Sequence, residues 1–258
     1  MKKPPKIIAH RGASAYAPEN TIASLDKARQ LSIDWVEIDV MLAKCGEVIL
    51  IHDTHLDRTT TGKGEVSHFT YAQISDLDAG GWFSEQYLGE KIPTLTNALT
   101  YLRQHSMSAI VEIKPYHGQE KKTADEVARI MNEVLPGNKT EFILSSFSIA
   151  SLYAARLALP GQHLGLALAI WDDSWQYHVE TLSCQSLHVD YRLLNPERVF
   201  KVKEMGLYLF AYTVNDLLSA NKLLQWGVDG IFSDYPDQMQ VAAALHHDDL
   251  RHRQDKVT

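Results

Sequence analysis

Residues 36–40, the stretch that most constrains the fold, alternate apolar and acidic side chains: Val36-Glu37-Ile38-Asp39-Val40. A strand sends alternate residues to the same face, so Glu37 and Asp39 should share a face opposite their apolar neighbours. A second stretch repeats the pattern with Glu112 and Lys114: Val111-Glu112-Ile113-Lys114. Charges on the inner face of a buried strand are costly unless something neutralises them. The pattern therefore predicts carboxylates that bind a hard divalent cation, with an anionic, phosphate-bearing substrate near the lysine.

The rest of the chain alternates short β-rich runs with longer segments of helical periodicity. Strands are predicted at residues 6–10, 35–42, 47–52, 109–114, 142–145, 164–168, 186–189, 208–212 and 230–232. Helices are predicted at residues 21–31, 95–105, 120–135, 149–158, 175–182, 196–205, 217–226 and 238–246, with Asn20 as the first N-cap. Roughly eight β/α units favour a (β/α)8 TIM barrel. A doubly wound open sheet is the alternative, but no G-x-G-x-x-G motif follows the first strand.

Residues 54–93 form a polar stretch that is too long for an ordinary loop between a barrel strand and a helix. They combine glycine-containing turns with apolar anchors such as Trp82 and Phe83. We therefore expect one TIM-barrel catalytic domain over residues 1–258, with a small subdomain at about 54–93 inserted after the second barrel strand. Residues 247–258 mix His, Asp and Arg without apolar periodicity and are expected to form a flexible tail.

Composition narrows the class of protein. The net charge of −7 and the lack of a long basic run argue against nucleic acid or an anionic membrane surface as a partner. No stretch approaches the ~18 apolar residues of a membrane helix, and the N-terminus lacks the apolar segment of a signal peptide. Cys45 and Cys184 form neither a metal-binding spacing nor a disulfide framework. We expect a cytoplasmic protein that acts on a small molecule without stable membrane association; the sequence does not predict its oligomeric state.

Polar groups stand at the ends of several predicted strands. In a TIM barrel the catalytic groups lie at the carboxyl ends of the strands, which barrel closure brings together. The groups expected around one cavity are three carboxylates, two histidines, an arginine and a lysine: Glu37, Asp39, Glu112, His10, His52, Arg11 and Lys114.

This set of groups fits hydrolysis of a phosphodiester. A cation such as Mg²⁺ or Ca²⁺, with Mn²⁺ as a further candidate, would bind the carboxylates and neutralise the phosphate charge. Arg11 suits bidentate contact with phosphate oxygens, and Lys114 suits a point-charge contact. His10 and His52 could divide the proton transfers, one activating the nucleophile and the other protonating the leaving alcohol.

Each residue also has a simpler interpretation when it is taken alone. His10 could be a satisfied core histidine, and the pair Glu37 and Asp39 could bind an arginine. Lys114 could merely neutralise Glu112. The coincidence of several strand ends favours the catalytic interpretation.

The motifs that carry these residues resemble those of the glycerophosphodiester phosphodiesterase family, in particular its short cytosolic bacterial type. The resemblance spans essentially the whole chain in order. It rests on His10-Arg11-Gly12 with Ala17-Pro18-Glu19-Asn20-Thr21, Glu37-Ile38-Asp39-Val40, His52-Asp53 with Leu56-Asp57-Arg58-Thr59-Thr60, Glu112-Ile113-Lys114-Pro115, Ser145-Ser146-Phe147, Tyr212-Thr213-Val214-Asn215 and Gly227-Val228-Asp229-Gly230-Ile231.

The resemblance implies a TIM barrel with a small insertion after the second barrel strand. It implies hydrolysis of glycerophosphodiesters, such as glycerophosphocholine or glycerophosphoethanolamine, to sn-glycerol 3-phosphate and an alcohol. It also implies one divalent cation on the carboxylates, the two histidines as acid and base, and phosphate contacts from Arg11 and Lys114.

Several alternatives stay open from the sequence. The attacking group is either water or the substrate's own glycerol hydroxyl, which would give a cyclic phosphate first. The substrate could instead be an acylated lysophospholipid, as in a lysophospholipase D. A third alternative is a barrel that binds glycerophosphodiesters without catalysis, but none of the metal or histidine positions is lost in this chain.

Overall fold

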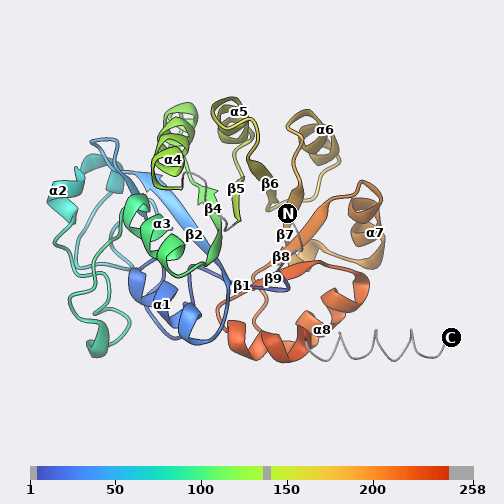
Figure 1. Ribbon diagram of the computed structural model, residues 1–258, viewed down its shortest axis with the longest axis horizontal. Coiled ribbons are helices and arrows are strands. Elements are labelled where there is room, and N and C mark those ends of the chain that lie inside the picture. The colour runs from blue at the N-terminus through green and yellow to red at the C-terminus, as the bar shows by residue number, and fades with distance from the viewer. Residues whose placement is uncertain (1–4, 136–140, 244–258) are drawn as a thin grey trace.

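The computed structural model describes residues 5–135 and 141–243, and its strands form a closed barrel (Figure 1). Within the described residues, the barrel strands are parallel: β1 (Ile7–Ala9), β2 (Trp35–Leu42), β4 (Ser108–Ile113), β5 (Phe142–Ser146), β6 (His163–Leu168), β7 (Ser186–Asp190), β8 (Tyr208–Tyr212) and β9 (Gly230–Ser233). β1 closes the sheet because it pairs with both neighbours, Ala9 with Val36 of β2 and Ile7 with Ile231 of β9. The predicted TIM barrel is confirmed.

Helices follow the strands and surround the barrel (Figure 1). They are α1 (Ile22–Gln30), α3 (Leu95–Gln104), α4 (Glu120–Val134), α5 (Ile149–Ala158), α6 (Ser174–Thr181), α7 (Pro196–Glu204) and α8 (Leu217–Trp226), and residues 236–243 are also helical. A short 3₁₀ helix, η3 (Tyr191–Leu193), follows β7.

The predicted N-cap of the first helix is wrong by one residue. Thr21 caps α1, since its side chain accepts a hydrogen bond from the Ser24 backbone N–H. Asn20 instead has a positive φ of 56° and donates its side-chain amide to Asp39 Oδ2 at 2.9 Å. The capping side chain is thus one residue further on, and Asn20 orients a carboxylate of the barrel.

The two faces of the strands are buried in different ways. Val36, Ile38 and Val40 point away from the barrel axis into the large apolar layer beneath the helices. A smaller apolar cluster fills the barrel interior: Ile8, Ile110, Ile143, Phe210 and Phe232. Since Glu37 and Asp39 alternate with the outward valines and isoleucine, they point inward, as the sequence pattern predicts.

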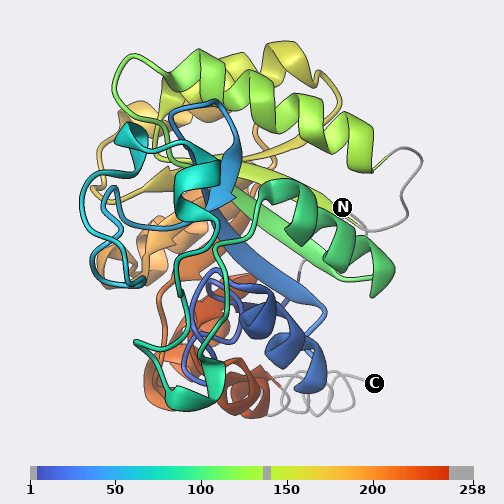
Figure 2. The ribbon, with the colours of Figure 1, turned by 90° about the vertical axis from the view of Figure 1, so that its left-hand side faces the viewer.

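One strand of the sheet runs against the barrel direction. β3 (Val48–Leu50) pairs antiparallel with β2, with Leu50 opposite Val40. The chain then forms a long excursion that contains η1 (Val66–His68), α2 (Tyr71–Ile74) and η2 (Glu85–Tyr87) before it enters α3. Figure 2 shows this excursion on one side of the barrel, beside β2 and α3. Its apolar side chains pack into a cluster of their own with β2 and β3: Met41, Ile49, Ile51, Leu56, Val66, Ile74, Ala79 and Ile92.

The expected tail at residues 247–258 lies outside the described residues. Among the helices of residues 5–135 and 141–243, none combines the length and the apolar character needed to cross a bilayer.

Candidate active site

The turn after β1 presents His10 and Arg11 at the mouth of the barrel. Arg11 and Gly12 both adopt positive φ values, 54° and 78°. A side chain at position 12 would collide with Ser24 of α1, so only glycine lets the turn lie against that helix. The Arg11 backbone N–H donates to Glu37 Oε2 at 2.9 Å. The His-Arg-Gly sequence therefore anchors the turn directly to the acidic cluster.

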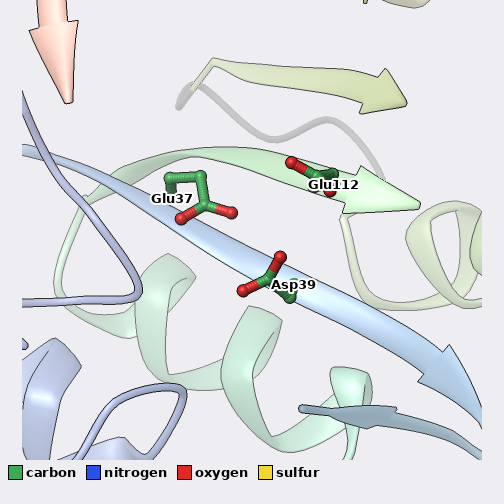
Figure 3. Close-up of side chains that lie close together, drawn as sticks. All are labelled: Glu37, Asp39 and Glu112. Atoms are coloured by element: carbon green, nitrogen blue, oxygen red, sulfur yellow. The ribbon is translucent and has the colours of Figure 1, made fainter. Parts of the chain in front are cut away.

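Three carboxylates converge inside the barrel (Figure 3). Glu37 and Asp39 project from the same side of β2, and Glu112 projects from the neighbouring β4. Each offers an oxygen that lies within 4.8 Å of the others. Glu37 and Asp39 are only 4% and 2% exposed. Buried carboxylates at this separation need a compensating positive charge.

The pKa values of the three carboxylates reflect their burial and their mutual repulsion. Burial, together with the charges of Asp39 and Glu112, raises the pKa of Glu37 well above its ordinary value. Burial and the Asp39 charge raise the pKa of Glu112 to about 7. Burial also acts to raise the pKa of Asp39, but the Arg11 and Lys114 cations outweigh it and lower that pKa. A bound divalent cation would lower the pKa of all three and favour their ionised forms. An all-oxygen donor set fits Mg²⁺, Ca²⁺ or Mn²⁺.

Lys114 lies beside this cluster. Its Nζ is 3.6 Å from Glu112 Oε1 and 3.7 Å from Asp39 Oδ1. Both interpretations from the sequence agree with this position, because Lys114 neutralises Glu112 and also lines the cavity.

Arg11 keeps hydrogen-bonding capacity for a ligand. Its Nη1 donates to Glu19 Oε1 at 2.8 Å, which fixes the guanidinium. Its Nε is buried and 3.4 Å from Asp39 Oδ2, yet makes no hydrogen bond. Arg11 also lines the cavity, so its positive charge lies where an anion would bind.

His10 is oriented by an aspartate from the far end of the chain. Its Nδ1 lies 2.7 Å from Asp234 Oδ1. Asp234 also accepts hydrogen bonds from Ser14 Oγ and Asn215 Nδ2, at 2.8 and 2.6 Å. Burial opposes ionisation of Asp234, but these donors and His10 lower its pKa to about 2. An ionised carboxylate can only accept, so Nδ1 carries the proton and Nε2, 4.0 Å from Glu37 Oε2, is free for proton transfer.

His52 follows a predicted strand that the structure shows to be antiparallel. It does not follow the carboxyl end of a parallel barrel strand, because β3 runs antiparallel to β2. The chain returns along β2 until the Ile51 N–H bonds to the Asp39 carbonyl oxygen at 3.2 Å, which brings His52 level with the carboxylates. Its Nδ1 lies 2.7 Å from Asp53 Oδ1, and burial lowers its pKa.

All seven predicted site residues line one cavity of about 460 Å³. The opposite wall comes from β5 to β9 and the segments that follow them. The family motifs already include Ser145, Phe147, Tyr212 and Thr213 of this wall, whereas its residues on β7 and directly after it were not predicted. The polar and aromatic members of the wall include Phe147, His188, Asp190, Tyr191, Arg192 and Tyr212. Asp234, the partner of His10, was also missed, although its position directly after β9 is the signal that identified the other residues.

Comparison with known proteins identifies the family of this chain. A model of the glycerophosphoryl diester phosphodiesterase family matches residues 10–238. A glycerophosphodiester phosphodiesterase of Bacillus subtilis is 38% identical over 248 residues, which cover 89% of this chain and 83% of that protein. One from Caldanaerobacter subterraneus is 35% identical and covers 90% of this chain and 95% of that protein.

A solved structure resembles the whole barrel. It is a phosphodiesterase of Oleispira antarctica in complex with the product sn-glycerol-3-phosphate. It is 37% identical, with a TM-score of 0.91, and the match covers 93% of this chain and 97% of that one.

Proposed function

Because the chain belongs to the glycerophosphoryl diester phosphodiesterase family, we propose that its cavity hydrolyses glycerophosphodiesters with one divalent cation and two histidines. Phosphodiesterase activity on this class follows from relatives at 35–38% identity over most of the chain. The cation, the roles of the residues and the individual substrates, such as glycerophosphocholine and glycerophosphoethanolamine, are what we propose beyond that activity. The Oleispira complex supports sn-glycerol 3-phosphate as the product.

The observation that carries the proposal is the convergence of three carboxylates, two of them buried, with an arginine and a lysine in one cavity. Glu37, Asp39 and Glu112 would hold the cation, which would neutralise the phosphodiester charge and orient the phosphoryl group. Arg11, which lines the cavity, would contact a phosphate oxygen through its guanidinium. Lys114, within 3.7 Å of two of the carboxylates, would contribute a second positive charge.

The two histidines suit the proton transfers. Each has Nδ1 2.7 Å from an aspartate, Asp234 for His10 and Asp53 for His52, and both aspartates have lowered pKa values. Each therefore keeps Nε2 for a proton at the reacting centre. One would deprotonate the attacking hydroxyl or water, and the other would protonate the departing alkoxide, which is a poor leaving group.

Two routes use these groups. Water attacks phosphorus directly, or the neighbouring glycerol hydroxyl attacks first and water then opens a cyclic phosphate. Hydrolysis in ¹⁸O-labelled water with trapping of the cyclic species distinguishes them, since only the second route forms a cyclic phosphate.

We also propose that the described chain acts as one catalytic domain and that residues 54–93 form a small inserted subdomain. The cluster around Leu56, Val66 and Ile74 supports this, because it is separate from the main core.

The test is release of sn-glycerol 3-phosphate from glycerophosphocholine. EDTA should abolish release, and Mg²⁺, Ca²⁺ or Mn²⁺ should restore it. His52→Ala should lose activity by about 100-fold or more while it still binds the cation. His68→Ala, at an exposed site away from the cavity, is the control and should retain activity.

Three results would contradict parts of the proposal. Full activity of metal-free protein would remove the cation from the mechanism. Tight binding without turnover would favour a non-catalytic binding barrel. Faster hydrolysis of the acylated substrate would favour the lysophospholipase D alternative.

A further inference from the structure

An arginine outside the cavity, Arg58, connects two residues that line it, Arg11 and His52, through two carboxylates. The guanidinium of Arg58 donates to Asp53 from Nε at 2.7 Å and from Nη2 at 3.0 Å. It donates to Glu19 from Nη1 at 2.6 Å and from Nη2 at 2.8 Å. Both carboxylates are held in the bidentate manner that gives arginine its geometric selectivity.

Each of these carboxylates also holds a cavity residue. Asp53 is 2.7 Å from His52 Nδ1, and Glu19 accepts from Arg11 Nη1 at 2.8 Å. The result is a continuous chain of charge-assisted hydrogen bonds, Arg11–Glu19–Arg58–Asp53–His52. It joins the turn after β1 to the segment after β3, which no strand pairing between β1 and β3 links directly.

The loop that carries Arg58 is itself fixed. Thr60 Oγ1 donates to the Leu56 carbonyl oxygen at 2.7 Å, and the Leu56 N–H donates to Gly64. Asp57 Oδ2 accepts from the Gly64 N–H at 2.8 Å. Arg58 is thus presented from a closed loop, so its position can define that of its partners.

A surface ion pair alone contributes little, and the Arg58 side chain is 43% exposed. Its partner Glu19 is much less exposed than a typical surface group, because that side chain is only 11% exposed. Arg129 offers a contrast within the same chain. It also binds two carboxylates, Glu126 and Glu133, but these lie on α4, are 31% and 60% exposed, and do not line the active-site cavity.

We propose that Arg58 is a positioning residue for the phosphodiesterase reaction, fixing His52 through Asp53 and Arg11 through Glu19. The inference rests on the proposed roles of His52 and Arg11. Without Arg58, the Asp53 carboxylate would rotate and His52 would lose its fixed Nδ1–H tautomer and ring orientation. Glu19 would likewise hold the Arg11 guanidinium less firmly for phosphate.

The experiment measures kcat and KM for glycerophosphocholine in the cation-loaded enzyme. Asp53→Asn should mainly lower kcat, and Glu19→Gln should mainly raise KM. Arg58→Ala should do both, with kcat/KM reduced roughly 10- to 100-fold, because small displacements of reacting groups are costly. Adding guanidinium ion at millimolar concentration should partly restore Arg58→Ala, and Arg58→Lys should stay impaired since it lacks the fork.

Arg129→Ala is the matched control and should behave as the wild type, with no response to guanidinium. Wild-type kcat and KM in Arg58→Ala would overturn the proposal. A loss that guanidinium does not relieve would also overturn it, because that result indicates a merely structural role.

A second measurement tests the positioning role independently of the proposed function. Ring ¹⁵N–¹H NMR correlations of His52 should show Nδ1 protonated in the wild type and mixed tautomers in Arg58→Ala. If the wild type fails to hydrolyse any glycerophosphodiester, the proposed function is wrong, and the NMR result still decides whether Arg58 positions His52. An unchanged His52 tautomer in Arg58→Ala would contradict the positioning role.

Discussion

Glu37, Asp39 and Glu112 have the same chemical group but different protonation equilibria. Asp39 lies within 4 Å of two cations, Arg11 and Lys114, which lower its pKa, whereas burial and neighbouring charge raise the pKa values of Glu37 and Glu112. The raised pKa values favour the protonated form of the two glutamates, whereas the lowered pKa of Asp39 favours its ionised form. Loading a divalent cation should release protons, and the affinity should rise with pH through the range near 7, where Glu112 titrates.

Glu37→Gln tests this account of the cluster. A glutamine resembles the protonated glutamate in shape and keeps an oxygen that accepts from the Arg11 N–H. The metal-free variant should therefore be as stable as the wild type to within about 1 kcal/mol at neutral pH. Cation binding, measured by calorimetry, should weaken by tenfold or more.

Urea unfolding of the metal-free proteins provides the stability comparison. A large loss of stability in Glu37→Gln would mean that Glu37 is ionised and paired before any cation binds, contrary to its raised pKa.

Strands and turns differ in how far the sequence predicts them. The alternation in residues 36–40 was sufficient to predict which side chains of β2 face inward, because strand geometry is local. The connection between β2 and β3 is short, which favours an antiparallel pair. The register of β3 against β2, which sets the position of His52, depends on nonlocal pairing. The Asn20 prediction was wrong for a similar reason, since a barrel carboxylate binds its side chain.

Gly12→Ala tests the turn that positions His10 and Arg11. An added methyl group would meet Ser24 of α1, in a backbone conformation with φ of +78° that alanine disfavours. We expect a loss of about 2 kcal/mol or more in the free energy of unfolding, together with a raised KM because Arg11 is displaced.

Gly118→Ala is the matched control for that variant. Gly118 has nearly the same φ, +77°, but no atom lies within 4 Å of the added methyl group. The free energy of unfolding should fall only by the conformational cost of a positive φ, about 1 kcal/mol, and KM should be unchanged. Equal losses in the two variants would show that the contact with α1 is unimportant.

The whole barrel determines what the sequence could not reveal about the site. Motif residues after β1 and on β2 and β4 were recognisable one at a time, but the residues on β7 and directly after it join them only after barrel closure. His188 illustrates this. On β7 it is an isolated histidine in the sequence, whereas in the barrel it is 3% exposed and packs on Phe210 and Phe232.

The cytoplasmic location stays a prediction.

His188 should make the stability of the molecule depend on pH. Burial lowers its pKa to about 3, whereas an unfolded histidine titrates near 6.5. Above pH ~6.5 both states are neutral and the contribution is constant. As the pH falls below that value only the unfolded state binds the proton, so stability decreases by about 1.4 kcal/mol per pH unit until the pH approaches the folded pKa.

The measurement compares urea unfolding of the wild type and His188→Gln between pH 7 and pH 4. The variant should lack this part of the decrease. His117→Gln, at an exposed position, is the control and should follow the wild type. A His188→Gln variant with the same pH dependence as the wild type would mean that His188 is not kept neutral by burial.

The central claim is that Glu37, Asp39 and Glu112 together bind the cation that the reaction requires. Anomalous X-ray diffraction from a crystal of the active enzyme in Mn²⁺ tests it most directly. The account predicts one strong anomalous peak among the three carboxylates, within coordination distance of an oxygen from each. A peak elsewhere, or none in crystals grown under conditions where Mn²⁺ supports turnover, would contradict it.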